Sequence, residues 1–110
     1  MHINTYNTDA STYALELNSN AKELLKVYND GNSKFGGTVY PASNNSYDLG
    51  TSSLRWRNVY TNDLNLSNEG GTNDVDGTWG NYTIQEGESD LFLINNRSGK
   101  KYKFNLTEVS

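Results

Sequence analysis

The segment that we take as the organiser of the fold reads Tyr47-Asp48-Leu49-Gly50-Thr51-Ser52-Ser53-Leu54-Arg55-Trp56-Arg57-Asn58-Val59-Tyr60. Its first residues predict a turn in which Gly50 takes the positive φ that other residues resist. Either Ser52 or Ser53 can then cap a turn of helix, because a side-chain oxygen there accepts from unpaired backbone N–H groups. No clean helical stripe continues beyond them, so we expect a short helical turn that runs into extended chain.

The same segment carries a tryptophan between two arginines, with a tyrosine at each end. We expect Trp56 to anchor a core, with both arginines on the opposite face if the chain there is extended. The alternative is that Trp56 fills a core while the arginines are merely solvated. Both interpretations make the segment architectural. The expected structural anchors are Tyr47, Asp48, Gly50, Arg55, Trp56, Arg57 and Tyr60.

The composition predicts a chain that completes its core with other copies of itself. Only 34% of the 110 residues are hydrophobic, and the mean hydropathy is -0.80. A small domain of this kind buries a low fraction of its surface and often needs staples or oligomerisation. The chain has no cysteine for a disulfide and no Cys/His cluster for structural zinc. We therefore expect a turn-rich β protein that is an obligate oligomer.

Charge and motif content argue against several classes of function. The net charge of -4 disfavours nucleic acid as a partner, because phosphate binding needs a concentrated basic face. No apolar run approaches the length of a membrane span, and Met1-His2-Ile3-Asn4 lacks the features of a secretory signal. His2 is the single histidine, so no Ser/His or Cys/His catalytic system can form within one chain. We expect no enzyme and no cofactor, although a carboxylate-only site between subunits stays open.

Short alternating segments predict strands throughout the N-terminal part. Residues 1–13 are polar and suit an attachment end. Tyr13 to Leu17 alternates with the period of a half-buried strand, which would place Tyr13, Leu15 and Leu17 on one side. Residues 23–28 fit a second strand better than a helix, because strong turn signals bound them. Residues 34–40 predict a third strand, interrupted by Gly36-Gly37 at a bulge or a close backbone approach and ended by Pro41.

The clearest regular structure is expected in the C-terminal part. A brief strand over 63–66 precedes a long loop over 67–80. The segments 79–86, 90–95 and 100–106 then predict a three-stranded meander. Its last strand is expected to have one buried face and one solvent-exposed face. Leu91-Phe92-Leu93-Ile94 is apolar on both faces and therefore predicts a central strand that is covered twice.

Three patterns resemble a known class of protein. The pattern P…N.YDLG.SSLRW.N.Y, from Pro41 to Tyr60, resembles a signature of tail-fibre and related virion proteins of tailed bacteriophages. The order strand, Asn-Asp-Gly, strand, Gly-Gly, strand, Pro resembles the shaft-to-tip region of phage fibres. The pattern TIQEGE…LFLIN.RSGKKYKFNL, within residues 79–106, resembles a C-terminal module in virion proteins of marine and cyanobacterial phages.

The resemblance implies a mainly β, intertwined homotrimer in the virion, in contact with other tail or capsid proteins. Its segments would be a shaft-like 1–40, a linker motif 41–66 with the helical turn, and a C-terminal loop and meander 67–110. The implied function is a non-catalytic fibre or spike tip that presents a surface to a host glycan. The alternatives are a capsid decoration protein or head fibre, which would use the same fold on the shell, and a depolymerase fragment.

Candidate sites lie in the long loop and at the start of the meander. Flat aromatic faces stack on sugars, and amide and carboxylate groups hydrogen-bond to them. The candidate glycan-binding residues are Asn73, Asp74, Asp76, Trp79 and Tyr82. The alternative for Trp79 is that it starts the meander and packs under it. Residues 73–77 could hold calcium, but a plain polar loop fits better because the further acidic ligands are missing. The acids at positions 86, 88 and 90 are expected to be solvated rather than a glycosidase pair.

Overall fold

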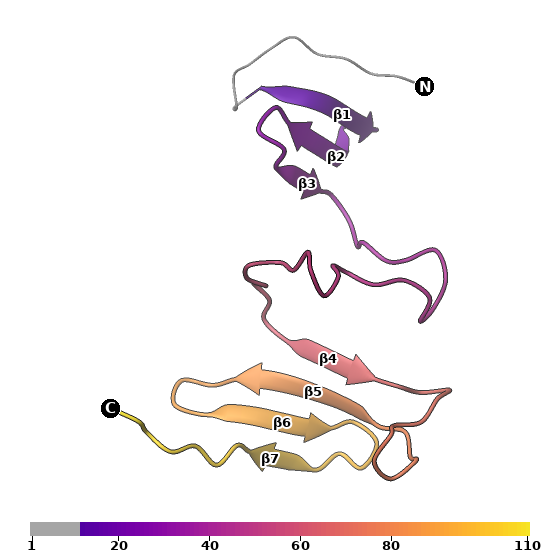
Figure 1. The fold of residues 1–110 in the computed structure, drawn as a ribbon. Helices are drawn as coiled ribbons and strands as arrows, with labels where there is room; N and C mark the ends of the chain where they lie inside the picture. The colour runs from indigo at the N-terminus through magenta and orange to yellow at the C-terminus, as the bar shows by residue number, and fades with distance from the viewer. Residues whose placement is uncertain (1–11) are drawn as a thin grey trace. The chain divides into compact units, whose positions relative to one another are not determined.

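The computed structural model describes residues 12–110, so the polar segment 1–13 lies almost entirely outside the described residues. The described chain contains seven β-strands and no helix, which confirms the mainly β prediction. The strands form two antiparallel sheets, one of three strands and one of four (Figure 1). The chain divides into two units, Met1–Thr51 and Ser52–Ser110, with one sheet in each. This boundary lies inside the predicted linker 41–66, while the division into 1–40, 41–66 and 67–110 stays a prediction.

The N-terminal sheet is a meander of β1 (Tyr13–Ser19), β2 (Lys22–Tyr28) and β3 (Ser33–Phe35). The segment 23–28 is thus a strand, as expected. Asn20 and Ala21 join β1 to β2 with φ values of 50° and 65°. Positive φ at both central residues is the type I′ geometry, whose twist matches that of the flanking strands.

The third strand is shorter than expected. It ends at Phe35 rather than continuing to residue 40, and residues 36–41 form bends and irregular chain. The reason lies in Gly36, whose N–H still donates to the carbonyl of Leu24 over 2.9 Å. A Cβ built on Gly36 would overlap the carbonyl oxygen of Glu23. The expected close backbone approach at this Gly-Gly pair is therefore confirmed, and it marks the end of the strand.

Register gives the N-terminal sheet one apolar face. Directly paired residues share a face, and Leu15 pairs with Val27 while Leu17 pairs with Leu25, which also pairs with Phe35. The apolar face of the N-terminal sheet therefore consists of Leu15, Leu17, Leu25, Val27 and Phe35. The expectation that Tyr13 also lies on this face is wrong. The register shifts between Tyr13 and Leu15, which pairs Tyr13 with Tyr28 on the opposite face.

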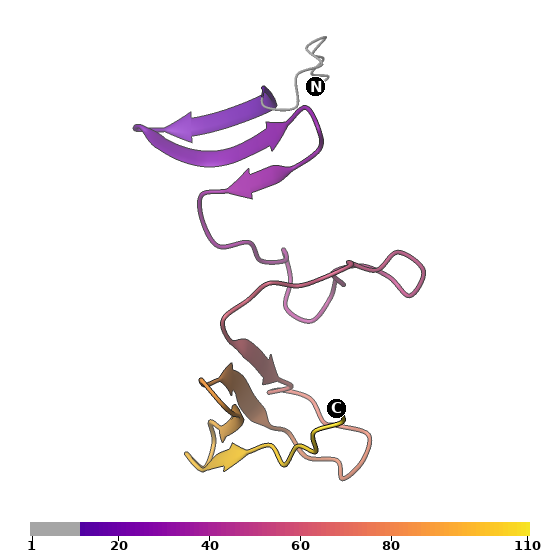
Figure 2. The same ribbon diagram turned by 90° about the vertical axis from the view of Figure 1, so that its left-hand side faces the viewer.

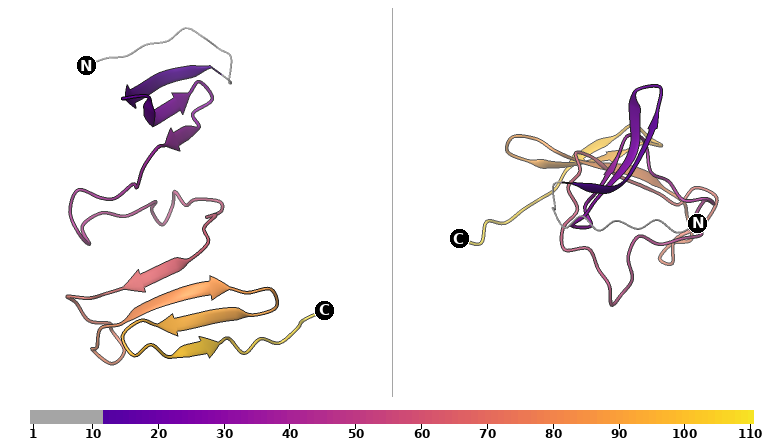
Figure 3. Two further views of the ribbon diagram at one scale, coloured as in Figure 1. Left: turned by 180° about the vertical axis from the view of Figure 1, so that it is seen from behind. Right: turned by 90° about the horizontal axis from the view of Figure 1, so that it is seen from above.

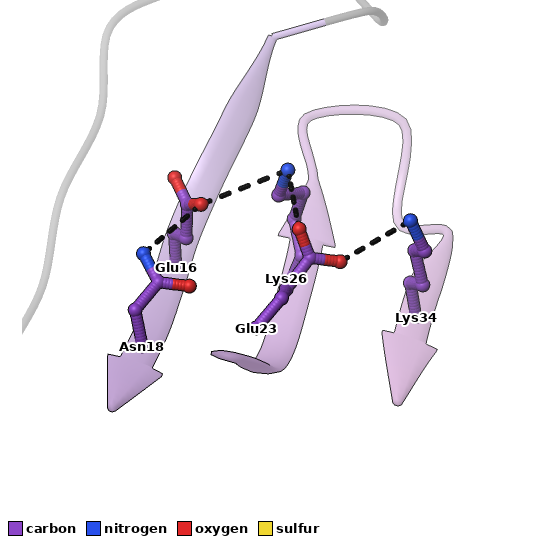
Figure 4. A network of polar contacts seen from close by, with 5 residues as sticks. All are labelled: Glu16, Asn18, Glu23, Lys26 and Lys34. Atoms are coloured by element: carbon purple, nitrogen blue, oxygen red, sulfur yellow. Dashed lines mark hydrogen bonds and ion pairs between the residues drawn. The ribbon is translucent and has the colours of Figure 1, made fainter. Parts of the chain in front are cut away.

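The opposite face of this sheet carries a network of charged side chains (Figure 4). Lys26 lies 2.8 Å from a carboxylate oxygen of Glu23 and 3.7 Å from one of Glu16, and Lys34 lies 3.3 Å from Glu23. A second register shift, between Leu17 and Asn18, leaves Leu24 unpaired and brings Glu23 to the face of Lys26. The ammonium of Lys26 also lies 4.3 Å from the centre of the Tyr13 ring. Hydrogen bonding to Glu23 raises the pKa of Lys26, and hydrogen bonding to Lys26 and Lys34 lowers that of Glu23.

The segment 36–63 contains neither strand nor helix. The expected helical turn after Gly50 is therefore absent, and the chain there forms bends and irregular chain. Gly50 does take the expected positive φ, at 87°. A turn also occurs at residues 44–45, where Asn45 has a φ of 53°. A capping serine at position 52 or 53 is not enough to form a helix. The first helical turn restricts the backbone of several residues and gains only one hydrogen bond, so its formation is unfavourable.

The C-terminal sheet has the order β4-β5-β6-β7, with β4 at Leu64–Ser67, β5 at Asn81–Glu86, β6 at Leu91–Asn95 and β7 at Lys101–Lys103. The predicted meander is confirmed, although each strand is shorter than expected. Backbone pairing does not continue through residues 104–106, apart from a bond from the Phe104 N–H to the carbonyl of Leu91. The brief strand expected near residues 63–66 pairs with β5 and extends the meander to four strands. Within its unit the sheet is one twisted layer of strands (Figures 2 and 3).

One face of this sheet carries most of its apolar residues, while Phe92 and Ile94 of β6 lie on the opposite face with Gln85 and Thr83. Leu64, Ile84, Leu93 and Tyr102 form one row across all four strands. The apolar face of the C-terminal sheet consists of Leu64, Leu66, Tyr82, Ile84, Leu91, Leu93 and Tyr102. β6 is internal to the sheet, as expected, but no layer of its own unit covers it. Tyr102 is 48% exposed, so the face that was expected to be buried is open within the single chain.

No apolar side chain is buried anywhere in residues 12–110. The one buried residue described is Thr83, which lies on the face opposite the row of Ile84 and Leu93. Its hydroxyl donates to Oδ1 of Asn65 over 2.7 Å and accepts from Nδ2 of Asn96 over 2.9 Å. The interior of the described chain is thus held by hydrogen bonds, and both apolar faces remain uncovered by their own units.

Candidate functional site

Two of the expected glycan-binding residues, Trp79 and Tyr82, meet at a depression at the start of β5. Its volume is about 350 Å³. The lining residues come from the start of β5 and from the end of β6 with the turn that follows: Trp79, Gly80, Tyr82, Asn95, Arg97 and Ser98. We call this depression the Trp79 pocket. Antiparallel pairing of β5 with β6 places Tyr82 opposite Asn95, which brings the β6–β7 turn over the beginning of β5.

Arg97 is held against Trp79 by two contacts. Its guanidinium carbon lies 3.7 Å from the centre of the Trp79 ring. One guanidinium N–H donates to the Trp79 carbonyl over 2.9 Å. A guanidinium over an indole face is attracted by the ring quadrupole, and its planar shape suits stacking. One face of the indole therefore lies against an arginine, while the alternative that Trp79 packs under the meander stays a prediction.

Asn95 fixes the turn that carries Arg97. Its Oδ1 accepts from the backbone N–H of Arg97 over 3.0 Å and from that of Ser98 over 3.2 Å. Its Nδ2 donates to the Tyr82 hydroxyl over 3.3 Å. One amide side chain thus joins the turn to the wall of the pocket, and such side-chain-to-backbone bonds are typical of asparagine in tight turns.

Gly80 allows the Tyr82 ring to lie against the backbone. A Cβ on Gly80 would lie 3.1 Å from Cε2 of Tyr82, closer than ordinary side-chain contacts. The N–H of Gly80 donates to Oδ1 of Asn68 over 2.7 Å, and its carbonyl accepts from the backbone N–H of Asn68 over 3.3 Å. This lining residue of the pocket is therefore tied to Asn68, the residue that follows β4.

The other expected glycan ligands stabilise their own loop. Oδ1 of Asn73 accepts from the backbone N–H groups of Val75 and Asp76, at 2.7 and 2.9 Å. Nδ2 of Asn73 donates to Oδ1 of Asp76 over 2.7 Å, and the Thr78 hydroxyl donates to the same oxygen over 2.7 Å. These bonds, first that from Asn73 and then those from Thr78, lower the pKa of Asp76. Asn73 and Asp76 thus have internal partners, which leaves fewer of their polar atoms for a ligand.

The structure does not bring the loop acids into the Trp79 pocket. Asp74 lies exposed at the tip of the loop, and neither it nor Asn73 or Asp76 lines the pocket. Within residues 12–110, no three His, Cys, Asp or Glu side chains are grouped so that they could hold a metal ion. The described residues also contain no helix long and apolar enough to cross a membrane. The acids Glu86, Glu88 and Asp90 are all exposed around the β5–β6 turn.

The expected structural anchors lie largely exposed in the single chain. Trp56 is 65% exposed and Tyr60 is 93% exposed, with Tyr47 at 69%. No structured element of residues 12–110 therefore forms a core around Trp56, and its role as an anchor stays a prediction about contacts between copies. Arg55, Arg57 and Asp48 are also exposed, while Gly50 is partly covered.

Sequence reasoning missed Asn95, Arg97 and Ser98 as members of the pocket. The signal was present in the turn sequence Asn95-Asn96-Arg97-Ser98-Gly99, which connects two strands of the predicted meander. In an antiparallel meander the turn after the second strand lies beside the beginning of the first. That rule places the turn that contains Arg97 next to Trp79.

Comparison with protein-family models, with curated proteins and with solved structures finds no match to this chain.

Proposed function

We propose that this chain is a structural subunit of a bacteriophage virion, a fibre or spike tip that assembles as a homotrimer. In this proposal it is non-catalytic, contacts other virion proteins and presents a surface to a glycan of the host. One observation carries the proposal: residues 12–110 form two regular sheets yet bury no apolar side chain.

The amount of uncovered apolar surface supports an obligate assembly. Eight large apolar side chains between residues 39 and 60 are each at least 65% exposed. They are Val39, Tyr40, Tyr47, Leu49, Leu54, Trp56, Val59 and Tyr60. Burying one such side chain contributes about 1.5–3 kcal/mol, so covering this set is worth on the order of 10 kcal/mol. That gain is comparable with the whole stability of an ordinary small domain, about 5–15 kcal/mol.

The two apolar sheet faces add to the same argument. A sheet with one apolar and one polar face must bury the apolar face against a second layer. Here neither unit supplies that layer to its own sheet, and Phe35 of the N-terminal sheet is 55% exposed. Symmetric copies of the chain can cover such faces in a closed oligomer. The trimeric number itself rests on the resemblance to phage fibres.

A homotrimer also suits the role of receptor attachment. Three equal weak sites on one rigid particle bind a dense host surface far more tightly than one site does. The Trp79 pocket is a polar depression where β5 begins and β6 ends, and a regular sheet supports it. This is a suitable place for such a site. The chain need perform no chemistry for this function.

The test is the solution mass of the full chain, measured by light scattering after gel filtration at low micromolar concentration. A species of three times 12.3 kDa is the expected result. A folded monomer would contradict the shared-core trimer and would favour a decoration protein that takes its symmetry from the particle. Cryo-electron microscopy of virions gives the second readout, since density at capsid vertices or capsomer centres would contradict a tail position.

A further inference from the structure

We infer that the Trp79 pocket binds a sugar that carries a negatively charged oxygen group, a carboxylate or a sulfate. This inference rests on the proposed function as a receptor-binding virion protein and names the class of glycan. It is carried by the hydrogen-bonding character of the pocket, which differs from that of the acidic loop beside it.

The named acceptors that line the pocket are already occupied. The Trp79 carbonyl accepts from Arg97, and the Gly80 carbonyl accepts from the N–H of Asn68. Oδ1 of Asn95 accepts from two backbone N–H groups, and its carbonyl accepts from the N–H of Gly99 over 2.8 Å. Each of these acceptors therefore already has a donor within the protein, which favours a ligand that brings acceptors of its own.

Donors, in contrast, remain available. A guanidinium has five N–H donors, and Arg97 uses one of them on Trp79. The Tyr82 hydroxyl accepts from Asn95, so its own proton is left to donate. The Ser98 hydroxyl accepts from the backbone N–H of Lys100 over 3.2 Å, which likewise leaves its proton. A ligand that offers only acceptors, such as a carboxylate, matches this set of donors.

Charge favours the same ligand. Among residues 12–110, the three ion pairs all lie in the N-terminal sheet, and Arg97 has no carboxylate partner. No acidic side chain lines the pocket. The stacked Trp79 ring restrains the guanidinium, so less side-chain freedom is lost when a ligand is bound. An arginine that is preorganised and unpaired is well suited to a planar carboxylate, which it can bind through two parallel hydrogen bonds.

The experiment titrates the isotopically labelled full chain with galacturonate, galactose and galactose 6-sulfate, while two-dimensional NMR follows the indole N–H of Trp79. We expect galacturonate or the sulfated sugar to shift this signal and the neutral sugar to leave it in place. The two charged arms show which oxygen group is recognised. Raising the salt concentration should weaken the binding, because the interaction is partly ionic.

Arg97→Gln is the decisive variant, and Lys100→Gln is its matched control. Both remove one positive charge from the same hairpin, but Lys100 does not line the pocket. We expect Arg97→Gln to weaken binding about tenfold or more, as for a lost charged hydrogen bond, and Lys100→Gln to change it by less than about twofold. Tyr82→Phe keeps the ring and removes only the hydroxyl, so it should weaken binding a few-fold even if Arg97→Gln disturbs the turn.

Three results would overturn the inference. If galactose binds as tightly as galacturonate, the pocket does not distinguish a charged sugar from a neutral one. If the Arg97 and Lys100 variants lose affinity equally, only the net charge of the hairpin matters and not the position of Arg97. Absence of any shift at Trp79 would mean that Arg97 and Trp79 form a purely structural pair. Light scattering on the same samples reports the assembly separately, so failure of the pocket and failure of the trimer are distinguishable.

Discussion

Gly36 lies so close to the backbone of Glu23 that a Cβ atom on Gly36 would overlap the Glu23 carbonyl oxygen. Its N–H donates to the carbonyl of Leu24 over 2.9 Å, so the chain cannot move away without breaking that bond. We expect Gly36→Ala to destabilise the N-terminal sheet by about 1–3 kcal/mol, the usual cost of overpacking. The measurement is denaturant unfolding, with hydrogen exchange of the β2 and β3 amides as the local readout.

Gly37→Ala is the matched control for this prediction. A Cβ at Gly37 would meet nothing within 4 Å, and its φ is not positive. The stability of this variant should stay within about 0.5 kcal/mol of the native value. If the two alanine variants had the same free energy of unfolding, the close approach at Gly36 would not restrict the residue at that position.

Ala21 offers a stabilising substitution. It occupies the second position of the β1–β2 turn with a φ of 65°, where a Cβ is unfavourable and glycine is preferred. Replacement by glycine should raise the stability of the N-terminal sheet by about 1 kcal/mol. Thermal unfolding followed by circular dichroism measures the change. Ala42→Gly, at an exposed residue whose φ is not positive, should instead be neutral or slightly destabilising.

Strand positions could be predicted from the sequence because alternation and turn residues act locally. Leu25 and Val27 lie on either side of Lys26, and Asn-Asp-Gly follows their strand, so both type and place were predictable. Tyr13 was assigned to the wrong face because a bulge shifts the register by one residue. Such a shift depends on cross-strand pairing with Tyr28, which local periodicity does not encode.

The candidate site was predictable only in part. Trp79 and Tyr82 stood out as aromatic residues near a loop, and they do meet in one pocket. Asn73 and Asp76 looked like ligands from their residue types, but the loop uses their polar atoms for its own turn. Arg97 was missed because its contact with Trp79 spans 18 residues of sequence and follows from the pairing order of the meander, not from residue type alone.

The loop around Asp76 should respond to acid. Hydrogen bonds from Asn73 and Thr78 lower the pKa of Asp76 in the folded loop. A depressed folded pKa means that its contribution is fully present above the pKa of the unfolded chain. The contribution is lost as the pH falls through the lower folded value. Carbon-13 NMR of the Asp76 carboxyl should therefore give a midpoint below the ordinary value of 3.8.

Two variants test the cause of this shift. Asn73→Ala removes the largest stabilising bond and should move the Asp76 midpoint back toward its ordinary value. Thr78→Val removes the hydroxyl donor while keeping the backbone N–H, so its effect should be smaller in the same direction. A midpoint unmoved by Asn73→Ala would show that the loop bonds do not hold the carboxylate in solution.

Trp56→Ala should separate assembly from folding. Trp56 belongs to neither sheet and is 65% exposed in the single chain, so its removal leaves every described strand pairing intact. If copies of the chain bury it in a shared core, truncation costs about 3–5 kcal/mol for each copy. Light scattering should then show loss of the species of three times 12.3 kDa. Val75→Ala is the control, since Val75 is 95% exposed at the tip of a loop and should leave the mass unchanged. An intact trimer in the Trp56 variant would place the shared core elsewhere, and the apolar face around Leu93 and Tyr102 would then be the next surface to mutate.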